Sequence, residues 1–267
     1  MAAVETSLAG AREAAASDGP PAIQIENLQK RFGTQPVLRG VDLQVGPGEL
    51  MVVIGRSGGG KSVLLRHILG LVRPDAGRIV IAGEDITTLR GRALDRVRER
   101  FGVVFQGGAL FDSLTVLQNV LFPIKEKSRV PVAQLLPRAQ EALAQVGLAD
   151  MGHKFPAEIS GGMRKRVAIA RALVTEPKVV FLDEPTTGLD PILVNSIHHL
   201  IVTLHRQFNF TAIMVSHEIP EIFRIANRVA VLNEGRIRQV GTPAEIEGSQ
   251  DRVVRQFIQG EIETEAR

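Results

Sequence analysis

Eight residues near position 60 combine glycine, lysine and serine at a spacing suited to binding phosphate. The segment from Gly55 to Ser62 has the form G-x-x-x-x-G-K-S. Glycines let backbone amides turn inward, where they form a nest for anionic oxygens. Lys61 is placed to reach the outer phosphates of a nucleotide, and the Ser62 hydroxyl to ligate Mg²⁺. The residues expected to contact the nucleotide here are Gly55, Arg56, Ser57, Gly58, Gly59, Gly60, Lys61, Ser62 and Val63.

The flanks of this segment match what a phosphate-binding loop requires. Apolar residues 50–54 precede it and predict a buried strand, and apolar residues follow it at helical spacing from Val63 to Leu69. The alternative is a flexible glycine linker, but a linker has no need for a strand before it and a helix after it. The predicted helix adds the positive end of its dipole to the phosphate site.

Two carboxylates form the second candidate for chemistry. Asp183 and Glu184 directly follow the apolar residues 179–182, which predict a buried strand. Ligands of open α/β sheets bind at the carboxyl ends of the strands. We expect Asp183 to bind Mg²⁺, directly or through water, and Glu184 to orient or polarise an attacking water. A solvated pair of loop acids is the alternative, and the pattern is weak without the phosphate loop.

The elements that must position these residues alternate along the chain. Apolar strand patterns separated by helical patterns predict a parallel α/β core of the P-loop NTPase, RecA-like class. The alternating residues 41–45 add a small antiparallel β subdomain, and helical patterns dominate a subdomain at about 107–158. We expect residues 1–21 to be a mobile tail, 22–245 the main domain and 246–267 a helical extension. The apolar face of the extension packs on the chain's own surface or, alternatively, on a second subunit.

Composition excludes several classes of protein. The 267 residues contain no cysteine, so disulfides and thiolate metal sites are excluded. The net charge of +3 is too small to indicate a nucleic-acid partner. No apolar run is long enough for a membrane span, and the first residues lack the pattern of a secretory signal. If the protein works at a membrane, another chain must supply the spans.

A third motif resembles one found in a known family. Residues 159–163, Ile-Ser-Gly-Gly-Met, are similar to the L-S-G-G-Q signature of ATP-binding subunits of ABC transporters. Ser160 is suited to cap a helix whose amino end faces phosphate. The resemblance implies that Ser160, Gly161 and Gly162 contact the γ-phosphate of an ATP molecule bound to a partner subunit. Two ATP molecules would then lie between the subunits of a head-to-tail homodimer.

The same resemblance assigns roles to residues elsewhere in the chain. Gln106 matches the glutamine that touches Mg²⁺ and water, and His217 matches the histidine that contacts the γ-phosphate. Residues 188–190 match the loop that crosses the dimer. Phe32 stands where the family usually has a tyrosine that stacks on adenine; core packing is the alternative. The resemblance thus implies an ATPase that uses ATP and Mg²⁺, with Glu184, His217 and Gln106 catalytic and Ser62, Gln106 and Asp183 holding the metal.

Residues 61–67, 105–116 and 160–168 resemble the lipid-asymmetry (Mla, or Mce-associated) branch of the family, whose signature also has Met in place of Gln. That branch implies phospholipid transport through a separate multi-span permease, with a lipid-binding substrate protein, at the cytoplasmic face of the inner membrane. An amino-acid importer with the same ATPase is the alternative. A non-transport ABC ATPase is disfavoured because the chain has one cassette and no long insertion.

Two further expectations concern the residues after Gln106 and those after the signature-like motif. Leu110, Phe111 and Leu114 either contact the permease or are buried within the subdomain. The basic residues 164–166 are expected to form a solvated helix surface that partly faces phosphate.

Overall fold

The computed structural model describes residues 19–259 of the chain. The described residues form two compact units, one made of 19–98 together with 211–259 and the other of 99–210. The first unit therefore contains the glycine loop, and the second contains the paired carboxylates and the signature-like motif.

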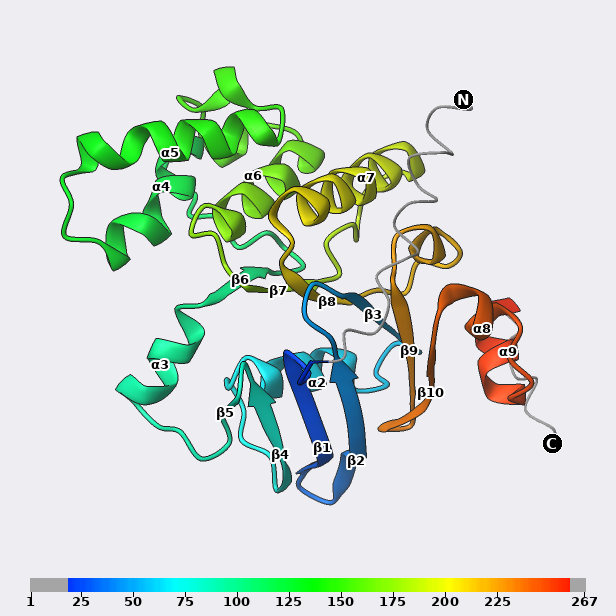
Figure 1. Cartoon of the computed structure of the whole chain (residues 1–267). Helices are drawn as coiled ribbons and strands as arrows, with labels where there is room; N and C mark the ends of the chain where they lie inside the picture. Colours follow the sequence, from blue (N-terminus) through cyan, green and yellow to red (C-terminus); the bar gives the residue numbers. More distant parts are fainter. Residues whose placement is uncertain (1–18, 260–267) are drawn as a thin grey trace. The chain divides into compact units, whose positions relative to one another are not determined.

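An antiparallel sheet forms one part of the first unit (Figure 1). Its strands, in spatial order, are β2 (Gln35–Val45), β1 (Ile23–Phe32), β4 (Ala76–Ile81) and β5 (Glu84–Asp85). Ile23 pairs with Val45 on one side and with Ile81 on the other, and all three side chains are buried. The alternation of buried and exposed residues along these strands matches the period of two expected for a sheet with one wet face.

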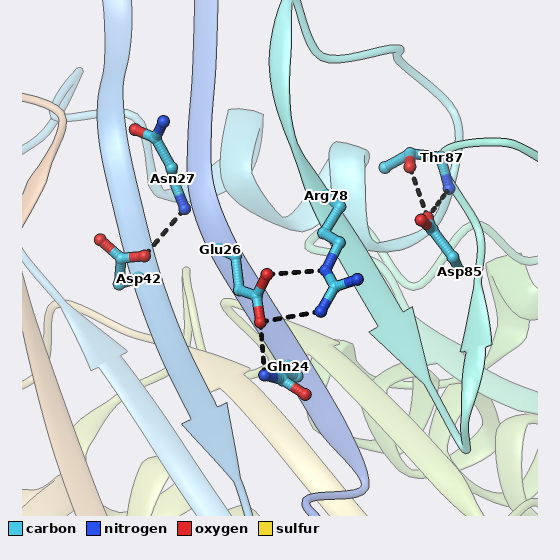
Figure 2. A network of polar contacts seen from close by, with 7 residues as sticks. All are labelled: Gln24, Glu26, Asn27, Asp42, Arg78, Asp85 and Thr87. Carbon is cyan, nitrogen blue, oxygen red and sulfur yellow. Dashed lines mark hydrogen bonds and ion pairs between the residues drawn. The ribbon is translucent and has the colours of Figure 1, made fainter.

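Polar contacts join the exposed groups of this sheet (Figure 2). Arg78 donates to both carboxylate oxygens of Glu26, at 2.6 and 3.1 Å, and this hydrogen-bonded pairing lowers the pKa of Glu26. Gln24 donates to the same carboxylate, and the backbone N–H of Asn27 donates to Asp42 at 2.8 Å. Exposed ion pairs contribute little to stability. The network therefore adds specificity to the pairing of β1 with β2 and β4, while the buried face supplies the stability.

Parallel strands form the other part of the first unit. The strand β3 (Leu50–Ile54) lies between β8 (Thr211–Val215) and β9 (Arg228–Asn233), parallel to both, and β10 (Arg236–Gly241) pairs antiparallel with β9. Every residue of β3 and β8 is buried, which explains their unbroken apolar sequences. The helical elements are α2 (Lys61–Ile68), α3 (Arg92–Arg98), α8 (Pro243–Glu247), α9 (Arg252–Gln259) and a 3₁₀ turn at Glu221–Arg224.

The second unit is mostly helical (Figure 1). Its two parallel strands are β6 (Phe101–Val104) and β7 (Val179–Asp183). Its helices are α4 (Val116–Lys127), α5 (Val132–Gln145), α6 (Gly161–Leu173) and α7 (Pro191–Phe208), with 3₁₀ turns at Ala149–Met151 and Pro156–Glu158. α6 packs against α4, α5, α7 and β6, so it is the central helix of this unit.

The predicted combination of parallel strands, a small antiparallel sheet and helices is confirmed by the strand pairing. β1 continues to Phe32, and the turn into β2 falls at residues 33–34. Val254 of α9 is fully buried and α9 contacts α8, which favours docking of the extension on its own chain. Residues 1–18 of the expected tail and the last eight residues of the extension lie outside the described part.

Phe181 is expected to be a major contributor to the stability of the second unit. Its side chain is fully buried in β7, and its ring meets that of Phe101 edge-on at 5.1 Å. Phe181→Ala should lower the free energy of unfolding by about 3–5 kcal/mol, measured by urea denaturation, because it removes a large buried ring and leaves a cavity. Phe208→Ala, at a position 36% exposed, serves as the control and should cost far less. Equal losses for the two variants would contradict the assignment of Phe181 to the core.

Candidate active site

The glycine loop joins β3 to α2 in the first unit, as the sequence predicts. Gly55 is buried beside β9: a Cβ atom at this position would lie 2.2 Å from the carbonyl oxygen of Leu232, so no larger residue fits. Gly60 precedes α2 with φ at 100°, a conformation that favours glycine. No side chain caps α2. The positive amino end of this helix is thus left to an external anion.

Lys61 is positioned at this loop by the loop's own carbonyls. Its side chain is buried, with the residue only 5% exposed, and its Nζ donates to the carbonyl oxygens of Gly55 at 2.7 Å and Arg56 at 3.0 Å. A nearly buried ammonium group on a glycine loop at the start of a helix fits the oxygens of a triphosphate. Ser62 and Val63 are partly buried at the start of α2, whereas Arg56, Ser57 and Gly58 are exposed.

His217 reaches the same edge of the parallel strands as the glycine loop. β3 and β8 are parallel with Val53 opposite Val215, and Gly55 and His217 each follow two residues later. The side chain of His217 is exposed. The structure therefore brings the loop and this histidine to one edge, although they are far apart in the sequence.

Phe32 lies at the end of β1 and is 50% exposed, with Lys30 Nζ 5.5 Å from the centre of its ring. The alternative of plain core packing for Phe32 is therefore wrong. An exposed ring of this kind is suited to stacking on a base.

In the second unit, Gln106 and Glu184 are in direct contact. β6 and β7 are parallel with Val104 opposite Leu182, so the residues after both strands emerge at one edge. Gln106 Nε2 donates to Glu184 Oε2 at 3.0 Å, and Asp183, the residue before Glu184, ends β7. Glu184 has φ at 45°, in the left-handed region that costs energy for a residue with a side chain. Such strain is typical of functional positions.

Thr187 is a member of this cluster that the sequence analysis missed. Its hydroxyl donates to Glu184 Oε2 at 3.0 Å, and its backbone N–H donates to the carbonyl oxygen of Glu184 at 3.3 Å. The only signal in the sequence is its spacing of three residues from Glu184, which allows a turn. The Thr187 hydroxyl and Gln106 Nε2 thus converge on one carboxylate oxygen and fix the direction of the Glu184 side chain.

The signature-like motif forms the amino end of α6. Ser160 is the N-cap residue, and its hydroxyl accepts from the backbone N–H of Met163 at 3.2 Å, as predicted. Ser160 is exposed, Gly161 is partly buried and Gly162 is buried, with a Cβ atom at Gly162 falling 3.4 Å from Leu193 of α7. Asp190, in the predicted dimer-crossing loop, caps α7 in turn by accepting from the N–H groups of Ile192 and Leu193. The exposed amino end of α6 is chemically suited to phosphate.

The residues expected to hold Mg²⁺ are a hydroxyl, a carboxamide and a carboxylate, from Ser62, Gln106 and Asp183. These are the oxygen ligands that Mg²⁺ prefers, and the ion usually takes few protein carboxylates and completes its shell with phosphate and water. Within residues 19–259 there is no cluster of three or more His, Asp or Glu side chains that would bind a metal alone. The donor set therefore fits a metal that arrives with a nucleotide.

One expectation for the second unit needs revision. The predicted solvated surface at 164–166 is wrong for Lys165, which is only 8% exposed and donates to the carbonyl oxygen of Gln106. Burial occurs because this face of α6 packs on the loop that follows β6. Phe111 is 43% exposed and contacts Phe122 at 4.8 Å between ring centres, whereas Leu110 and Leu114 are partly buried.

Comparison with known proteins places this geometry in a family. The family described as ABC transporter matches residues 38–187. A methionine import ATP-binding protein, MetN, of Xanthomonas euvesicatoria pv. vesicatoria is 42% identical over 84% of this chain and 68% of its own length. The probable ribonucleotide transport ATP-binding protein mkl of Mycobacterium tuberculosis is 38% identical over 92% of this chain and 69% of its own length. The chain spans as little as 60% of a further methionine import relative, from Mesorhizobium japonicum.

A solved structure agrees with these relatives. The dimeric post-hydrolysis state of the ATP-binding cassette MJ0796, bound to ADP and Pi, superposes with a TM-score of 0.75 at 30% identity, covering 83% of this chain and 98% of that one. The predicted P-loop NTPase fold, the ATPase activity and the use of ATP with Mg²⁺ are confirmed at the level of the family. The predicted lipid-asymmetry branch is not supported, because these relatives are named for methionine import and ribonucleotide transport. The chain belongs to the ABC transporter family, as one of its ATP-binding and ATP-hydrolysing cassettes.

Proposed function

We propose that this chain is the ATPase subunit of a transporter and works as a homodimer bound to a separate multi-span permease. Family membership and the dimeric state of the MJ0796 cassette support the dimer. None of the helices between residues 19 and 259 is long and apolar enough to cross a membrane. We therefore assign the membrane-spanning path to the permease, and the cassette to the cytoplasmic face of the inner membrane.

The chemistry proposed for each residue combines what the family resemblance implies with the contacts that the residue makes within its own unit. The loop amides and Lys61 bind the phosphates, Phe32 stacks on the base, and Ser62, Gln106 and Asp183 would hold Mg²⁺, which would neutralise phosphate charge. Glu184 orients the attacking water, and His217 contacts the terminal phosphate. The observation that carries this proposal is the Glu184 carboxylate, which Gln106 and Thr187 hold in one orientation on a backbone with positive φ. Positioning and electrostatic stabilisation supply most of the catalysis in phosphoryl transfer.

Ser160 is proposed to act on ATP bound to the partner subunit. Ser160→Arg should lower the hydrolysis rate by about 10²-fold or more, because a bulky cation replaces a small exposed cap at the amino end of α6. Binding of ATP, measured by titration with a fluorescent analogue, should change by less than about threefold because the glycine loop is intact. Gln140→Arg, at an exposed position of α5, adds the same charge elsewhere and should hydrolyse ATP normally. Normal hydrolysis by Ser160→Arg would remove the case for a site shared between subunits.

For the transported substrate, we propose import of an amino acid. The match to methionine import ATP-binding proteins over 84% of the chain supports this class better than phospholipid transport. Lipid transport stays the second candidate, and the observation that favours it is the resemblance of residues 105–116 and 160–168, including Met163, to the lipid-asymmetry branch. A lipid-binding substrate protein belongs to that second candidate only.

Co-purification followed by reconstitution distinguishes these candidates. The chain is isolated with its membrane partner, placed in liposomes and supplied with ATP, and uptake of labelled methionine and other amino acids is compared with movement of a fluorescent phospholipid. The proposal predicts ATP-dependent uptake of an amino acid. Phospholipid movement without such uptake would replace it with lipid transport, and association with ribosomes or DNA instead of a permease would reject both.

A further inference from the structure

Two basic residues of α6 bind the backbone of the loop that carries Gln106. Lys165 Nζ donates to the carbonyl oxygen of Gln106, and Arg171 donates to the carbonyl oxygens of Gly108 and Ala109, each at 2.7 Å. Three carbonyls in four consecutive residues thus accept hydrogen bonds from one helix. That helix is the one whose amino end is capped by Ser160.

The loop itself is a tight turn that lies on α6. The backbone N–H of Gly108 donates to the carbonyl oxygen of Phe105 at 2.8 Å, which closes a four-residue turn around Gln106. Gly108 is buried with φ at 77°, and a Cβ atom at this position would be 3.6 Å from the Ala168 side chain. The turn and the helix are therefore in contact as well as hydrogen-bonded, so a displacement of one displaces the other.

Lys165 is buried and Arg171 is partly buried, and packing alone does not explain the cost of removing these charges from water. Lys165 is only 8% exposed, and burial lowers the pKa of Arg171. In the part of the chain that the structure describes, the hydrogen bonds of Arg171 go to neutral carbonyls and not to a carboxylate. A buried charge is expensive unless its partners compensate it, and an apolar side chain would fill the same space at lower cost. We attribute the presence of these two cations to their hydrogen bonds, which fix the direction of the loop carbonyls.

We propose that Lys165 and Arg171 are positioning residues that hold the Gln106 carboxamide against Glu184. They thereby couple the orientation of α6 to the orientation of the Glu184 carboxylate. Gln106 Nε2 lies 3.0 Å from Glu184 Oε2, and the backbone of Gln106 is the part that Lys165 binds. The inference rests on the proposed function of Glu184 in orienting water. Loss of either cation leaves Gln106 present but free to turn away from the carboxylate.

Lys165→Met, which keeps the length of the side chain and removes its charge, tests this coupling. The turnover number for ATP should fall by about tenfold while the KM changes by less than about twofold, since small misplacements of positioning groups reduce catalysis more than binding. Lys165→Arg should restore most of the rate. The decisive measurement is the double variant with Gln106→Ala. If Lys165 acts through the carboxamide, adding Lys165→Met to Gln106→Ala should change the rate by less than about twofold.

Controls separate this inference from loss of folding and from failure of the proposed function. Arg138→Met is the matched variant, because Arg138 of α5 also donates to a backbone carbonyl oxygen, that of Val174 at 2.7 Å, away from Gln106; its turnover should be unchanged. The positioning role would be overturned if the rate losses of Lys165→Met and Gln106→Ala multiply in the double variant. A normal rate of ATP hydrolysis by Lys165→Met would overturn it as well. Full activity of Glu184→Gln would instead overturn the proposed function itself.

Discussion

Lys61→Ala is expected to reduce ATP hydrolysis by about 10³-fold or more, equivalent to at least about 4 kcal/mol of transition-state stabilisation. ATP binding should weaken as well. The reason is the position of the ammonium group, which is buried beside the glycine loop and bonded to the carbonyls of Gly55 and Arg56. Alanine removes both the charge that meets the phosphates and the contact that shapes the loop.

The Lys61→Ala prediction is checked by phosphate release and by equilibrium binding of ATP. Lys178→Ala, which removes an exposed lysine at the entry to β7, is the control and should behave like the unmodified chain. Thermal unfolding of both variants shows whether the substitution in the loop also lowers the stability of the fold. Phosphate release by Lys61→Ala at a near-normal rate would contradict the assignment of residues 55–62 as the loop that binds the phosphates of ATP.

Glu184→Gln is expected to retain ATP binding while hydrolysis falls by about 10²-fold or more. Glutamine has nearly the same shape and keeps an oxygen that can accept from Gln106 or Thr187, but it lacks the negative charge that polarises water. Because the bound nucleotide is then not consumed, the variant should accumulate as an ATP-bound dimer. Size-exclusion chromatography with and without ATP and Mg²⁺ measures this directly.

The control for Glu184→Gln is the same change at Glu141, an exposed residue of α5, which should leave turnover and association unaltered. A Glu184→Gln protein that binds ATP yet stays monomeric would count against the trapped dimer. One that hydrolyses ATP normally would exclude Glu184 as the water-orienting carboxylate.

Elements with an unbroken apolar sequence and a clear boundary could be predicted closely. The strand at 50–54 and the helix that starts at Lys61 have the predicted positions, because glycine and proline limit them and burial on both faces leaves no ambiguity. β5 and β10 were not predicted. β5 has only the two acidic residues Glu84 and Asp85, and β10 alternates basic and apolar residues that are half exposed. Their pairing depends on β4 and β9, which no local pattern reveals.

The residues of the candidate site also divide into those that a local motif predicts and those that only the fold brings together. The motifs located the phosphate loop, the carboxylates and the capped helix, since each is a local arrangement of neighbouring residues. The buried Lys165, the hydroxyl of Thr187 and the contact between Gln106 and Glu184 join residues from different segments or from a turn, so only the fold reveals them. The substrate class was the least predictable property, because the short motifs that suggested lipid transport are outweighed by relatives named for import.

The central claim is that each active site combines the glycine loop of one chain with the Ser160 helix of another. Mixing Lys61→Ala chains with Ser160→Arg chains tests it most directly. In a head-to-tail mixed dimer both defects fall in one site, and the second site has an intact loop and an intact helix. Each variant alone should be inactive, and the mixture should recover roughly a quarter of normal ATP hydrolysis by random pairing into two-fold dimers. A mixture as inactive as its components would contradict the claim, since a site contained in one chain cannot be repaired in this way.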